Sequence, residues 1–132
     1  MSFWDCLHIK NLVTKPSTHC RNLYKILFWL TLIVIFYLAF APNVSVGPEF
    51  ENADKYKHTL AFFVLTNLFI YAYEKGFKLV WFWMLFIGIF IEVVQHFIPN
   101  RESSVFDILA DGTGIFLATI FKLYIEKSYA VE

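Results

Sequence analysis

The stretch of sequence that decides the fold runs from Phe77 to Ile98 and reads FKLVWFWMLFIGIFIEVVQHFI. A helix needs about 20 predominantly apolar residues to cross the hydrocarbon core of a bilayer. This stretch has that length and ends at Pro99, and apart from a few polar positions it is apolar around the whole circumference of a helix. It therefore predicts a transmembrane helix.

Three further stretches have the same character: Leu23 to Ala41, Lys57 to Tyr73 and Val105 to Tyr124. None alternates as a strand would, and a transmembrane barrel needs about eight such strands. A helix satisfies every backbone polar group within lipid. We therefore predict an all-α, polytopic membrane protein with four transmembrane helices.

The composition agrees with a membrane protein. Of the 132 residues, 58% are hydrophobic and 17% are charged, whereas soluble domains are about 45–50% apolar and about 25% charged. Eleven basic residues balance 11 acidic ones, so the net charge gives no reason to expect a nucleic-acid partner.

The lysines and arginines predict the orientation, because they concentrate in the cytoplasmic loops of membrane proteins. Eight lie on one side of the predicted spans: Lys10, Lys15, Arg21, Lys25, Lys75, Lys78, Lys122 and Lys127. Three lie on the other: Lys55, Lys57 and Arg101. This places both termini in the cytoplasm, with a cytoplasmic segment over 1–22, a membrane domain over 23–124 and a cytoplasmic tail over 125–132.

The two cysteines, Cys6 and Cys20, both precede the first apolar stretch. Their spacing fits neither a C-x-x-C motif nor a zinc site. We therefore expect reduced thiols and no disulfide.

Ionisable and strongly polar residues collect at one membrane depth, toward the outer leaflet. Such groups are costly within a membrane and by default indicate a functional site. The candidate ligand-binding residues are Asp54, Lys55, His58, Glu92, Gln95, Arg101, Asp107 and Asp111. Among them His58, Glu92 and Asp107 are the candidates for acid–base catalysis.

Each residue also has a structural interpretation. Asp107 follows Ser104 by three residues, which is the spacing of a capping box. Glu92 could pair with Arg101 or Lys55 to hold the helices together. Glycines such as Gly88 and Gly114 would permit close helix contact.

Taken in order, these residues resemble the VanZ-like family of small bacterial membrane proteins. The pattern is Asp54-Lys55-x-x-His58, Glu92-x-x-Gln95, Ile98-Pro99-x-Arg101, Ser104-x-x-Asp107 and Asp111-x-x-Gly114. The family commonly has Asn in place of Asp111. The resemblance implies a multi-pass protein of the bacterial cytoplasmic (inner) membrane, and a role related to resistance to the glycopeptide antibiotic teicoplanin.

Three kinds of function follow. The polar residues could bind an amphiphile of the cell envelope, such as a membrane lipid or a lipid-linked cell-wall precursor. They could perform acid–base chemistry on such a substrate, or they could lock the helices of a structural subunit that has membrane-protein partners. We expect no cofactor and no metal, although a metal site formed by His58, Glu92, Asp107 and Asp111 is conceivable.

Overall fold

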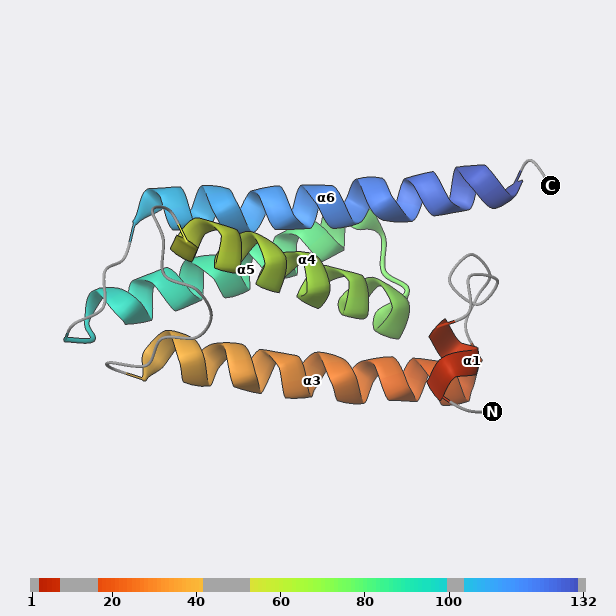
Figure 1. Cartoon of the computed structure of the whole chain (residues 1–132), viewed down its shortest axis with the longest axis horizontal. Coiled ribbons are helices and arrows are strands. Elements are labelled where there is room, and N and C mark those ends of the chain that lie inside the picture. The colour runs from red at the N-terminus through yellow and green to blue at the C-terminus, as the bar shows by residue number, and fades with distance from the viewer. Residues whose placement is uncertain (1–2, 8–16, 42–52, 100–103, 131–132) are drawn as a thin grey trace.

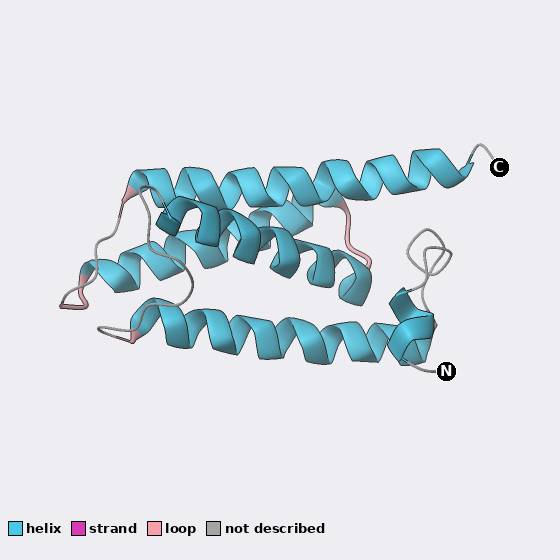
Figure 2. Cartoon of the chain, viewed as in Figure 1, coloured by secondary structure: helices cyan, strands magenta, loops and turns pink. Residues whose placement is uncertain are grey.

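The computed structural model describes residues 3–7, 17–41, 53–99 and 104–130. All its regular elements over these ranges are helices: α1 (Phe3–Leu7), α3 (Thr18–Phe40), α4 (Ala53–Tyr73), α5 (Phe77–His96) and α6 (Val105–Ala130). The four long helices run lengthwise beside one another, with α3 and α6 along opposite edges of the view in Figure 1. Figure 2 shows the same helices joined by short loops and by segments outside the described residues.

The helices match the predicted spans, but three of them are longer, and α4 begins at Ala53 and not at Lys57. Helix α3 begins at Thr18 and not at Leu23, because Ser17 is its N-cap and accepts a hydrogen bond from the Cys20 amide at 3.3 Å. Helix α6 continues to Ala130. Most of the predicted tail over 125–132 is therefore a continuation of the last helix.

Three of the long helices are long and apolar enough to cross a membrane: Thr18–Phe40, Phe77–His96 and Val105–Ser128. Helix α4 is not among them, and it contacts each of the other three long helices. It also has an outward face, because Tyr56 and Leu60 are each 65% exposed. The fourth membrane span stays a prediction.

The apolar core fills the middle of the bundle. Its buried side chains come from all four long helices and include Phe28, Phe62, Met84, Ile91 and Ile115. Many large apolar side chains on the outside, such as Trp29, Phe86 and Phe116, are about half exposed. An exposed apolar exterior around an apolar core is the arrangement expected where lipid is the solvent.

Gly114 brings α4 and α6 into close contact. A Cβ atom at Gly114 would overlap the carbonyl oxygen of Thr59 and lie 2.9 Å from the amide nitrogen of Phe63. The Thr59 hydroxyl also donates to the Ala110 carbonyl at 3.2 Å. Only glycine permits this crossing, which confirms the predicted use of glycine for helix contact at this position.

Gly114→Ala should separate α4 from α6 and destabilise the protein by about 1–3 kcal/mol, the usual cost of overpacking. The matched control is Gly112→Ala on the same helix, where no atom lies within 4 Å of the added Cβ and alanine is the better helix former. Thermal unfolding in detergent measures both variants. Equal melting temperatures for the two would contradict the close crossing.

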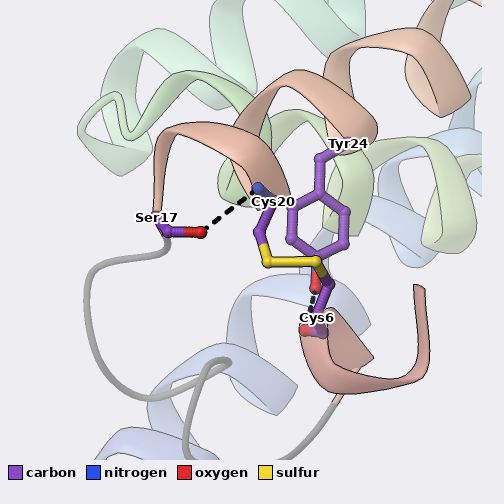
Figure 3. The surroundings of a disulfide bond; sticks show 4 residues. All are labelled: Cys6, Ser17, Cys20 and Tyr24. Carbon is purple, nitrogen blue, oxygen red and sulfur yellow. Dashed lines mark hydrogen bonds between the residues drawn. A yellow bond between two sulfur atoms is a disulfide. The ribbon is translucent and has the colours of Figure 1, made fainter. Parts of the chain in front are cut away.

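The expectation of reduced cysteines is wrong in this structure, because Cys6 and Cys20 form a disulfide with an S–S distance of 2.07 Å (Figure 3). The bond joins α1 to the first turns of α3. The Tyr24 hydroxyl donates to the Cys6 carbonyl at 2.6 Å and closes the same small cluster. Sequence spacing does not show that α1 folds back onto α3, so it could not reveal the pairing.

The disulfide also bears on orientation. Stable disulfides belong to oxidising compartments and are rare in the cytosol. The lysine and arginine count instead predicts that this end of the bundle lies in the cytoplasm. The two features therefore favour opposite orientations of the chain in the membrane.

Candidate functional site

A cluster of polar side chains lies at the end of the bundle opposite the disulfide, on the left of Figure 1, where α4 and α6 begin and α5 ends. Helix α4 contributes Lys55 and His58, α5 contributes Glu92, and α6 contributes Asp107 and Asp111. Residues three or four apart lie on the same face of a helix, and this spacing directs each pair toward its neighbours. We call these five residues the polar cluster.

His58 and Asp111 form the innermost pair. His58 Nδ1 lies 2.8 Å from Asp111 Oδ1, and the Asp111 side chain is 0% exposed. Gly88 of α5 makes room for this carboxylate, because a Cβ there would lie 2.8 Å from Asp111 Oδ2. Three helices therefore meet around one carboxylate.

Lys55 and Asp107 form a second pair nearer the surface. Lys55 Nζ donates to Asp107 Oδ1 at 2.7 Å. The Asp107 side chain is 6% exposed, whereas that of Lys55 is 36% exposed. The ammonium group thus neutralises a buried carboxylate while part of the lysine side chain stays at the surface.

Glu92 accepts a hydrogen bond from the Ser104 amide at 3.1 Å. This bond links the end of α5 to the start of α6. In a capping box the acidic residue three positions after the cap would accept this bond from the Ser104 amide. The capping interpretation of Asp107 is therefore wrong, because Glu92 takes that role and Asp107 binds Lys55. The Ser104 hydroxyl still caps α6 by accepting from the Phe106 amide at 3.1 Å.

Two carboxylate oxygens of the polar cluster have no hydrogen-bond partner among the described residues: Glu92 Oε1 and Asp111 Oδ2. Glu92 is 5% exposed and Asp111 is 0% exposed. Buried polar atoms in proteins are nearly always paired, so such an atom calls for an explanation.

An apolar groove with a volume of about 380 Å³ lies between α5 and α6 and reaches Glu92. It is an open hollow on the surface and not an enclosed cavity. The groove is lined by Ile89, Glu92, Val93, His96, Phe97, Ser104, Val105 and Ile108. Several of its apolar side chains, including Phe97 and Val105, are exposed on the outside of the bundle.

Of the three predicted site residues outside the polar cluster, only Gln95 has a side chain that the structure describes. Gln95 is buried at the same end, but its amide nitrogen donates to the Ala39 carbonyl at 2.9 Å and ties α5 to α3. Arg101 lies outside the described residues, as does the side chain of Asp54. The pairing of Glu92 with Lys55 is wrong, since Lys55 binds Asp107.

Sequence reasoning missed the contribution of Ser104 as a donor to Glu92, and of Gly88 as the space for Asp111. The capping-box spacing was the signal for Ser104, but it pointed to the wrong acid. The groove follows from packing and leaves no signal in the sequence.

The chain is similar to a protein from a fission yeast. An uncharacterised protein of the fission yeast Schizosaccharomyces pombe is 31% identical over 106 residues, which cover 76% of this chain and 63% of that protein. The chain thus spans less than two thirds of the length of this relative. No family model matches the chain, and no solved structure matches it significantly.

Lys55→Met should destabilise the protein by about 1–3 kcal/mol, because it leaves the Asp107 carboxylate buried without its cation. A matched control is Lys78→Met, which removes an exposed lysine at the opposite end. Denaturant unfolding in detergent measures both. The double variant Lys55→Met/Asp107→Asn should recover part of the loss. An equal effect of Lys55→Met and Lys78→Met would contradict the pairing.

Proposed function

We propose that this protein binds an amphiphilic molecule of the membrane, with an apolar chain of the ligand in the groove between α5 and α6 and its polar head at the polar cluster. The observation that carries the proposal is the junction of the two surfaces. Glu92 lines the apolar groove and also belongs to the polar cluster, where its Oε1 atom has no partner among the described residues. A ligand with both an apolar and a polar part matches this junction.

Two considerations support the choice of ligand class: the resemblance seen in the sequence and the organism of the relative. The resemblance to the VanZ-like family supports a bacterial cell-envelope molecule, such as a lipid-linked cell-wall precursor, in the bacterial inner membrane, and a role in glycopeptide resistance. The relative in a fission yeast favours a ligand that eukaryotic membranes also contain. A phospholipid satisfies both and is the ligand we propose to test first.

Ile108→Trp should fill the groove and weaken phospholipid binding by about tenfold, equivalent to about 1.4 kcal/mol. The matched control is Ile120→Trp on the same helix, at an exposed position outside the groove. Native mass spectrometry of the detergent-purified protein, titrated with phosphatidylethanolamine, counts the bound lipid. Equal lipid retention by the two variants would contradict the proposal.

The polar cluster faces the outer side in this proposal, as the excess of lysine and arginine at the other end supports. A cysteine introduced at exposed Phe97, in a chain lacking Cys6 and Cys20, should react with an impermeant maleimide added to intact bacterial cells. A cysteine at exposed Lys75, at the opposite end, should not react. The reverse pattern would place the cluster in the cytoplasm and the Cys6–Cys20 end outside.

A second candidate is a membrane enzyme, favoured by the 2.8 Å contact between His58 and Asp111. A histidine oriented by a carboxylate is a common general base, and Glu92 would be the acid. Mass spectrometry of the phospholipid after incubation separates the two functions, because an enzyme converts the lipid and a binding protein returns it unchanged.

A further inference from the structure

We infer that His58, Glu92 and Asp111 form a binding site for a divalent transition-metal ion, and that Zn²⁺ fits it best. From the sequence alone no metal is expected. The site would hold an ion whether or not the groove binds an amphiphile, because it is formed by the three side chains alone.

The first support is the convergence of the three ligands. One ligand atom from each of His58, Glu92 and Asp111 lies within 4.8 Å of the others, and each residue belongs to a different helix. A central ion about 2.0–2.2 Å from each ligand atom fits a set of this size. Asp107 belonged to the conceivable set but is paired with Lys55.

The second support is the pair of unpartnered oxygens. Glu92 Oε1 and Asp111 Oδ2 are buried and accept no hydrogen bond within the described part of the chain. An ionised carboxylate in an apolar interior costs several kcal/mol unless a cation or donors compensate it. A metal ion would compensate both carboxylates at once.

The third support is the balance of charge. Glu92 and Asp111 carry two negative charges when ionised, and neutral imidazole carries none. A divalent cation therefore leaves the three-ligand site neutral. The mixed set of one imidazole and two carboxylates suits Zn²⁺ and resembles sites that leave a fourth position open. Because Glu92 also lines the groove, the fourth ligand would be an oxygen of water or of a bound head group.

The test begins with metal analysis of the full-length protein purified in detergent. Inductively coupled plasma mass spectrometry should find close to one Zn²⁺ per chain. After the zinc is removed with a chelator, added Co²⁺ should produce visible absorption bands typical of a low-coordinate nitrogen–oxygen site. Zn²⁺ should also raise the melting temperature of the chelated protein. Each readout is independent of lipid binding, so a failure here leaves the amphiphile proposal standing.

Asp111→Asn and His58→Asn should abolish the Co²⁺ bands and the stabilisation by Zn²⁺. The control is Glu126→Gln, which removes the half-exposed carboxylate that pairs with Lys122 on α6 and should leave both unchanged. If the first two variants fail to fold, Gly88→Ala is the alternative, because its Cβ displaces Asp111 Oδ2 and should weaken metal binding. A wild-type protein that shows neither bound metal nor saturable Co²⁺ bands would overturn the inference, as would full metal binding by Asp111→Asn.

Discussion

Buried charge is the constraint on which the rest of this structure depends. Asp111 is fully buried and Glu92 and Asp107 are almost so, at one end of an otherwise apolar bundle. The cost of an unpaired ion in such surroundings is several kcal/mol. Each carboxylate is therefore held where another helix supplies a partner: His58 for Asp111, Lys55 for Asp107 and the Ser104 amide for Glu92.

These pairings fix how the helices approach one another. Contacts between Lys55 or His58 and α6 require α4 and α6 to be close, and Gly114 allows this. Gly88 does the same for α5, because it leaves space for the Asp111 carboxylate. The apolar core then fills the rest of the bundle. At this end the packing follows from the polar groups, whereas in most membrane bundles small residues and van der Waals contact dominate.

The sequence was enough to predict the four long helices but not α1, and it grouped the polar residues at one end, because the length and depth of an apolar stretch are local properties. The sequence could not show which residue each buried carboxylate binds. Whether Asp107 or Glu92 caps α6 depends on how α5 approaches Ser104, which is a long-range property. The Cys6–Cys20 disulfide was missed for the same reason, since it requires α1 to lie against α3. The observed helix ends differ from the predicted ones by several residues where a cap such as Ser17 lies outside the apolar stretch.

The most direct test of the polar cluster is a solid-state NMR measurement on the protein in lipid bilayers. The aspartate carboxyls carry ¹³C and the histidine rings carry ¹⁵N. The 2.8 Å contact between His58 Nδ1 and Asp111 Oδ1 predicts a strong dipolar coupling between the Asp111 carboxyl carbon and the His58 ring. If the Asp111 carboxyl carbon shows no coupling to any histidine ring, α4 and α6 do not bring His58 and Asp111 together, and the polar cluster does not exist as described.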